Sequence, residues 1–200
     1  MVNNKEQLLE LIKESRAQGN DPRVHGNRFL QFDLPDNRRL HVFGDERLPG
    51  RGNSCQSVPT TIHDHIYSFV SQILCGELCN KTYDVVPGTT YHRCYGIPNM
   101  NILHKSGNET YDVVSTGTYF MKAGSQYFFK SRHYHESLAF EPTLTLMMKT
   151  ENLDGEMPNV LCPINADPDN KFSRWGHDIT MLYSVMQDAL DRIDSSINFL

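Results

Sequence analysis

The stretch Ile62–Val86, IHDHIYSFVSQILCGELCNKTYDVV, decides how this chain folds. A strand-like apolar run over Ile66–Leu74 meets a tight turn at Cys75-Gly76-Glu77, and a second run follows over Leu78–Val86. The pattern predicts two β-strands joined by a turn. Just ahead of the first run, His63-Asp64-His65 places two imidazoles one residue apart. In an extended chain such side chains point to the same face and converge on one point.

Outward from this stretch, the sequence predicts a β-core bracketed by two helices. Leu8, Leu9 and Ile12 have helical spacing within Lys5–Arg16, and a second amphipathic helix begins after Asp178, a good N-cap residue. Turn signals between these helices are closely spaced, as in an antiparallel sandwich or barrel. Strands are predicted at Arg28–Leu34, Arg39–Phe43, Thr90–Tyr95, Met100–His104, Tyr111–Met121, Gln126–Lys130, His133–Phe140 and Thr143–Lys149, with turns at Pro35-Asp36-Asn37 and Pro87-Gly88.

The remaining segments complete a single predicted domain over residues 1–200. It comprises a helix at about 5–16, a β-barrel at about 28–150, and a loop with a C-terminal helix at about 151–195. Asp45–Thr60 is rich in Gly, Pro, Ser and Asn and is predicted to be a loop, and Asn152–Arg174 is predicted to be irregular. The apolar stripe of the last helix packs against the β-core or forms the seam of a homodimer.

Composition narrows the function classes. A chain of 200 residues with 38% hydrophobic residues and a net charge of -5 is ordinary for a globular protein and a poor candidate for binding nucleic acid. No apolar run approaches the ~20 residues of a membrane helix, so no membrane partner is expected. The five cysteines form no C-x-x-C pair, and the first residues lack a signal pattern. We therefore expect free thiols and a cytoplasmic location.

A pair of converging histidines suits a divalent transition metal, because neutral imidazole is a good ligand for Zn, Cu, Fe and Ni. Such a site needs a third ligand from another strand. The segment Gly124–His135, GSQYFFKSRHYH, supplies two candidates, His133 and His135.

These residues resemble the two motifs of the cupin superfamily. His63, His65 and Gly76 match its first motif, and the distance from Gly124 to His135 matches that from glycine to histidine in its second. The resemblance implies a mostly β fold, a double-stranded β-helix or jelly-roll-like barrel with a metal at its mouth. It makes His135 the third ligand, with His133 as the alternative. The Pro and Gly of the second motif fall on Lys130 and Arg132.

The glutamate of the first cupin motif falls on Phe69, so the implied shell is three neutral histidines with open positions. The metal strand also looks like that of the thiol dioxygenases, cupins that hold Fe(II) with three histidines and oxidise cysteine or cysteamine. The resemblance therefore implies a divalent transition metal, with Fe(II) as first choice and Ni, Zn or Mn as alternatives. It implies an oxygenase acting on a small molecule and O2.

Two other functions stay open on the sequence. One is a non-oxidative cupin, such as an isomerase, epimerase or lyase, in which the metal acts as a Lewis acid. The other is a binding module without catalysis. Catalytic residues are not assigned, and the candidates are His92, Arg93 and His133. The arginines that could hold a substrate carboxylate are Arg28, Arg38, Arg39 and Arg93, and Asp64 is predicted to point away from the metal.

Overall fold

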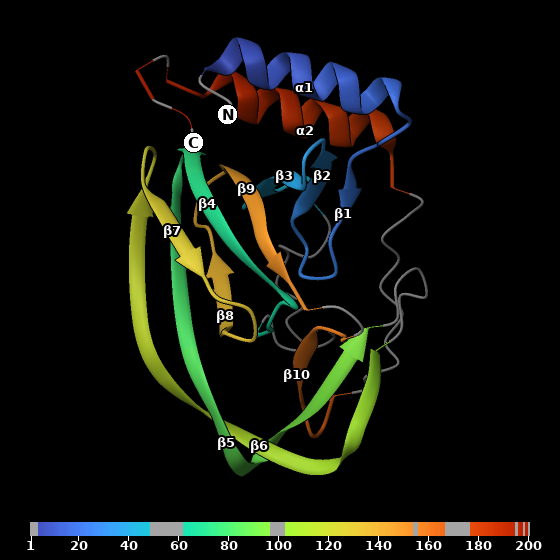
Figure 1. Cartoon of the computed structure of the whole chain (residues 1–200), viewed down its shortest axis with the longest axis vertical. Coiled ribbons are helices and arrows are strands. Elements are labelled where there is room, and N and C mark those ends of the chain that lie inside the picture. The colour runs from blue at the N-terminus through green and yellow to red at the C-terminus, as the bar shows by residue number, and fades with distance from the viewer. Residues whose placement is uncertain are drawn as a thin grey trace.

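The computed structural model describes residues 4–48, 62–96, 103–153, 156–166, 177–194, 196, 197 and 199. Two helices lie side by side at one end, and the rest of this part of the chain is almost entirely β-structure (Figure 1). The predicted class, mostly β with an N-terminal and a C-terminal helix, is confirmed. The elements are α1 Lys5–Ala17, β1 Arg23–Val24, β2 Leu30–Leu34, β3 Arg38–Phe43, β4 Tyr67–Cys75, β5 Glu77–Gly96, β6 Leu103–Lys122, β7 Gln126–Phe129, β8 Tyr134–Leu138, β9 Thr143–Asn152, β10 Asn159–Pro163 and α2 Ile179–Asp191.

The strands form two antiparallel sheets, consistent with the predicted jelly-roll-like barrel. One sheet has the order β1-β2-β3-β9-β4-β7, and the other has the order β10-β5-β6. The second edge of β5 pairs first with β8 and then, further along, with β10. Every pairing between the named strands is antiparallel.

Side-chain alternation gives the six-stranded sheet two different faces. On β3, Leu40 and Val42 are fully buried and pack with α1 and α2 in the main hydrophobic core. Their neighbours Arg39, His41 and Phe43 line a cavity on the opposite face. Because successive side chains of a strand point to opposite faces, one strand can serve both the core and a polar site.

Two glycines form corners where the chain passes from one sheet to the other. Gly76 between β4 and β5 has φ +81°, and Gly124 between β6 and β7 has φ +86°, both in the left-handed region that glycine enters without strain. The corners bond to each other, since the Gly124 N–H donates to the Ile73 carbonyl at 2.8 Å and Ala123 N–H to the Gly76 carbonyl at 3.1 Å. The two glycines of the cupin-like motifs are therefore fold-determining residues.

The hairpin predicted around Pro35-Asp36-Asn37 is confirmed, with Asp36 and Asn37 at φ 58° and 59°. The turn predicted at Pro87-Gly88 is wrong, because β5 runs through both residues with a register shift against β6. Asp112 Oδ1 replaces part of the missing ladder by accepting from the Thr89 and Thr90 N–H groups, each at 3.0 Å. β5 and β6 thus continue around a bend (Figure 1) as one long ribbon.

The prediction of an irregular segment after Asn152 is wrong at β10, a short strand enclosed by Pro158 and Pro163 and paired with β5. Prolines at both ends obscured its signal. The two-residue β1 was also missed. The predicted loop Asp45–Thr60 lies outside the described residues beyond Leu48, as does the strand predicted at Met100–His104 except for its last two residues, which open β6. Neither described helix is both long and apolar enough to cross a membrane.

Candidate metal centre

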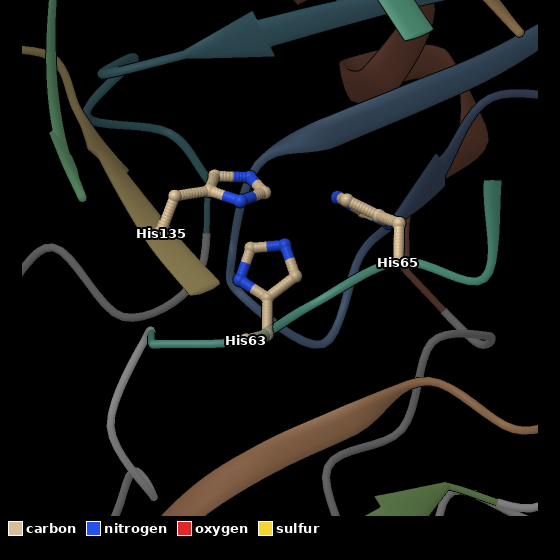
Figure 2. A group of neighbouring side chains, drawn as sticks. All are labelled: His63, His65 and His135. Atoms are coloured by element: carbon tan, nitrogen blue, oxygen red, sulfur yellow. The ribbon is translucent and has the colours of Figure 1, made fainter. Parts of the chain in front are cut away.

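Three histidine side chains point toward one another in the cavity beside the six-stranded sheet (Figure 2). Ligand atoms of His63, His65 and His135 all lie within 4.8 Å of one another. The ring centroids are 4.7 Å apart for His63 and His65, 4.6 Å for His63 and His135, and 5.2 Å for His65 and His135. This is the only such group of histidine, cysteine and acidic side chains in the part of the chain that the structure describes.

Backbone pairing brings the distant ligands together. His63 lies just ahead of β4 rather than within it and forms an isolated bridge with His135 on β8. The His63 N–H donates to the His135 carbonyl at 3.0 Å, and the His135 N–H donates back to the His63 carbonyl at 2.9 Å. His65, two residues further along the same extended segment, turns its ring to the same side, as the H-x-H spacing predicted.

Hydrogen bonds to the outer ring nitrogens orient two of the imidazoles. His135 Nδ1 lies 3.1 Å from the His133 carbonyl, which can only accept, so Nδ1 carries the proton and Nε2 keeps its lone pair. The Asn27 side-chain amide contacts His63 Nδ1 at 3.1 Å. The amide nitrogen Nδ2 of Asn27 faces this Nδ1, and the contact fixes the orientation of the His63 ring.

The environment keeps the rings of His65 and His135 neutral. Burial lowers the pKa of His65 and His135 well below 6.5, and the neighbouring His63 imidazole lowers both further. His41, which also lines the cavity, has a pKa lowered to about 3 by burial and by Arg39. Neutral imidazole is the form that binds a metal ion, so the group is ready to act as a ligand set at neutral pH.

The wall around the histidines is aromatic. Phe69, which occupies the glutamate position of the cupin motif, has its ring centroid 5.2 Å from His65 and 6.0 Å from His135. The ring centroid of Phe129 lies 4.4 Å from that of His135. No aspartate or glutamate is among the described residues that line the cavity, so the ligand set is neutral. The space of about 530 Å³ between these residues includes open solvent, so the cavity is a recess at the surface and not a closed chamber.

A cationic cluster adjoins the cavity through Arg39, which is one of the lining residues. Arg39 donates to the Tyr67 hydroxyl at 3.0 Å and pairs with Asp33 at 2.8 Å, and Asp33 also pairs with Arg23 at 2.5 Å. The ammonium of Lys149 lies 4.6 Å from the centre of the Tyr67 ring, and its pKa falls to about 8 through burial and the charge of Arg39. Burial raises the pKa of Asp33, but Arg39 and Arg23 outweigh it and the net shift is downward. Two arginines thus pair with one carboxylate, and Lys149 adds a third positive charge over the Tyr67 ring.

The other predicted site residues lie elsewhere. His92 and Arg93 are on β5 opposite β10, and the Arg93 guanidinium stacks on the Tyr111 ring at 4.3 Å, away from the cavity lining. His133 stacks on Phe129 at 5.4 Å and is outside the three-histidine group. Asp64 points away from the cavity as predicted, and it is a buried residue that pairs with Arg132.

Sequence reasoning left one important residue unselected and missed others. Arg39 was one of four equivalent arginines, and Asn27 and His41 were not selected for the cavity. A signal existed for Arg39 and His41, because they alternate with the apolar Leu40 and Val42 on one strand. Asn27 gave no such signal, because it lies in the link between β1 and β2 and reaches His63 only through the tertiary fold.

Comparisons with known proteins find distant structural likeness only. No protein-family model and no curated protein matches the chain. Among solved structures, the hydroquinone 1,2-dioxygenase PnpCD in complex with Cd2+ and 4-hydroxybenzonitrile is 12% identical over 60% of this chain and 61% of that one, with a TM-score of 0.35. The Drosophila melanogaster CENP-C cupin domain is 7% identical over 73% and 97%, with a TM-score of 0.32.

The hydroxypropylphosphonic acid epoxidase from S. wedmorenis is 10% identical over 64% of this chain and 55% of that one, with a TM-score of 0.29. This chain therefore spans less than two thirds of the length of either enzyme. TM-scores this low transfer neither an activity nor a ligand, so the function has to be argued from the cavity itself.

Proposed function

We propose that this protein is a metal-dependent oxygenase of the three-histidine type that acts on a small anionic molecule. The observation that carries the proposal is the convergence of His63, His65 and His135 in a cavity whose described lining contains no carboxylate. A group of three neutral donors leaves positions open at a bound ion, as catalytic sites do and structural sites do not.

The residues present fit a divalent transition metal. Three imidazole nitrogens are close enough to share one ion, burial lowers the pKa of His65 and His135, and the His133 carbonyl fixes the tautomer of His135. Imidazole suits Fe, Zn, Cu and Ni, and we propose Fe(II) because the segment Ile62–Val86 locally resembles the metal strand of three-histidine thiol dioxygenases. A redox-active ion held there would supply both Lewis acidity and one-electron chemistry toward O2.

The cationic cluster would bind the acidic group of the substrate. Arg39 lines the cavity, and a guanidinium recognises a carboxylate with two parallel hydrogen bonds. Asp33 offsets only one of the three positive charges of Arg23, Arg39 and Lys149. An anion near Arg39 would therefore gain attraction in a partly buried site, and its other end would extend toward the histidines.

The aromatic wall would exclude water from the reacting end of the substrate. Phe69 is 5% exposed and Phe129 is 7% exposed, and both pack against histidines of the group. An apolar wall beside the open positions strengthens electrostatic interactions there and limits side reactions with water. Phe69 in place of a carboxylate also leaves the full charge of the ion to attract an anionic co-ligand.

Metal loading and oxygen uptake test the proposal together. Protein purified without a chelating tag would be loaded anaerobically with Fe(II), Ni(II), Mn(II) or Zn(II), one equivalent each. Oxygen consumption would then be followed with small thiols that carry a carboxylate, thiols without one, and ring diols. We expect uptake only with Fe(II), fastest with a thiol carboxylate, and a product heavier by two oxygen atoms.

His63→Ala is the control for this experiment, because it removes one ligand and should abolish both metal retention and oxygen uptake. Turnover of a carbonyl substrate without oxygen uptake, by protein loaded with Zn(II), would instead support a non-oxidative enzyme. A wild-type protein that retains no transition metal would refute the proposal and leave a binding module.

A further inference from the structure

Asp64, which separates the two histidines of the H-x-H segment, accepts hydrogen bonds at both of its carboxylate oxygens. It is 1% exposed. Its Oδ1 accepts from the Asn159 N–H at 2.6 Å, and its Oδ2 accepts from the Asn159 side-chain amide at 2.8 Å. Arg132 Nη1 lies 3.2 Å from Oδ2 and 3.4 Å from Oδ1. None of these contacts reaches a histidine ring, so Asp64 acts on the backbone that carries the rings.

The partners of Asp64 also hold the same segment through their backbones. The Arg132 N–H donates to the His65 carbonyl at 2.8 Å, and the Asp64 N–H donates to the Asn159 carbonyl at 2.9 Å. Asn159 opens β10, while Arg132 lies in the turn between β7 and β8, three residues ahead of His135. The network therefore ties the segment of His63 and His65 to the turn that leads into the third histidine.

The segment His63–Ile66 depends on these side-chain contacts because it does not belong to a regular strand ladder. His63–Ile66 precede β4, and His63 makes only isolated bridges, one to His135 and one to Val160. In a regular strand the neighbouring strands fix side-chain positions, whereas an irregular segment depends on specific side-chain contacts.

The backbone of Arg132 shows that the contact is maintained against a local preference. Arg132 has φ +66°, in the left-handed region where a side chain with a Cβ is strained and glycine is favoured. The position nevertheless holds an arginine. Its guanidinium also donates to the Met157 carbonyl at 2.8 Å and pairs with the Glu156 carboxylate. Strain of this kind persists where surrounding contacts over-determine the conformation.

We propose that Asp64 and Arg132 are positioning residues that set the metal affinity of the three-histidine site without contacting the metal. The inference rests on the proposed metal site and adds to it the residues that hold the two halves of the ligand set in register. Groups that hydrogen-bond to ligand side chains commonly change metal affinity by about 10- to 100-fold when they are removed, and Asp64 and Arg132 would act through the backbone that carries the ligands.

Metal titration of two variants tests the inference. Asp64→Asn keeps the shape of the side chain but loses the charge that Arg132 faces. Arg132→Gly removes the guanidinium that faces the buried Asp64 carboxylate, and the relief of the left-handed backbone offsets part of the stability that this change costs. We expect Co2+ to bind about 10- to 100-fold more weakly to each variant in competition with a chromophoric chelator. The visible absorption bands of bound Co2+ should also shift at saturation, which a loss of global stability alone would not cause.

Asp45→Asn is the matched control, because Asp45 is also buried, at 6% exposed, and paired with an arginine, Arg47, but lies outside the cavity lining. Its Co2+ affinity should stay within about twofold of the wild type. If Arg132→Gly and every folded form of Asp64→Asn bind Co2+ like the wild type, the positioning role is overturned. If wild-type protein itself fails to bind one equivalent, the metal site is wrong and the inference falls with it.

Discussion

Replacing His135 by alanine should abolish tight metal binding, whereas replacing His133 should not. The two residues are alternate positions of one segment, and a register error of two residues would exchange them. The structure places His135 in the three-histidine group, 3% exposed, and places His133 outside it on the ring of Phe129. The pair therefore forms a matched test of one ligand and its nearest non-ligand.

The size of the effect follows from the number of ligands. Apparent binding energies of four-ligand zinc sites are about 10–16 kcal/mol at pH 7, or roughly 3 kcal/mol per ligand. Losing one of three imidazoles should thus weaken binding about 100-fold. At a free metal concentration 100 times the wild-type Kd, the ion stabilises wild-type protein by about 2.7 kcal/mol. The same concentration should stabilise His135→Ala by only about 0.4 kcal/mol.

Thermal unfolding with and without Zn2+ measures this difference. For a chain of this size, about 1 kcal/mol corresponds to roughly 2–4 °C in Tm, so the metal-induced rise should shrink from about 5–11 °C to about 1 °C. His133→Ala should show the full wild-type rise. The assignment of His135 as third ligand would be contradicted if Zn2+ raised the Tm of His135→Ala as much as that of the wild type. It would also be contradicted if only His133→Ala lost the rise in Tm.

Three further outcomes are expected. Arg39→Gln should weaken binding of small carboxylates at least about tenfold in calorimetry while Zn2+ affinity is unchanged, because Arg39 faces the cavity but is no ligand; equal carboxylate affinity would remove the anion site. Gly76→Ala should lower the free energy of unfolding in urea by about 3 kcal/mol, because φ is +81° and a Cβ would lie 2.4 Å from Thr143 Oγ1; a neutral effect would mean that the corner can relax. Metal-free protein should lose stability as pH falls below 6.5, because the folded pKa of His41 is about 3 and the unfolded chain binds the proton first. The loss due to His41 is about 1.4 kcal/mol at pH 5.5, and His41→Gln should abolish that share in urea melts across this pH range.

Local signals in the sequence were enough for the element types. The N-cap at Asp178, the turn at Asp36-Asn37 and the corner at Gly76 each depend on the chemistry of one or two residues, and all three are found in the structure. Element lengths were harder, since β5 passes through Pro87-Gly88 because Asp112 from the neighbouring strand satisfies its backbone. A contact from 22 or more residues away cannot be read from a local turn signal.

The same distinction separates the two parts of the site. The pairing of His63 with His65 was predictable from the sequence alone, because two residues one apart in an extended chain share a face whatever surrounds them. The tertiary structure alone brought His135 rather than His133 to that pair, selected Arg39 among the arginines, and buried Asp64 against Arg132. Those choices depend on which strands pair and in which register, and register is set by the packing of the whole fold and not by any short stretch of chain.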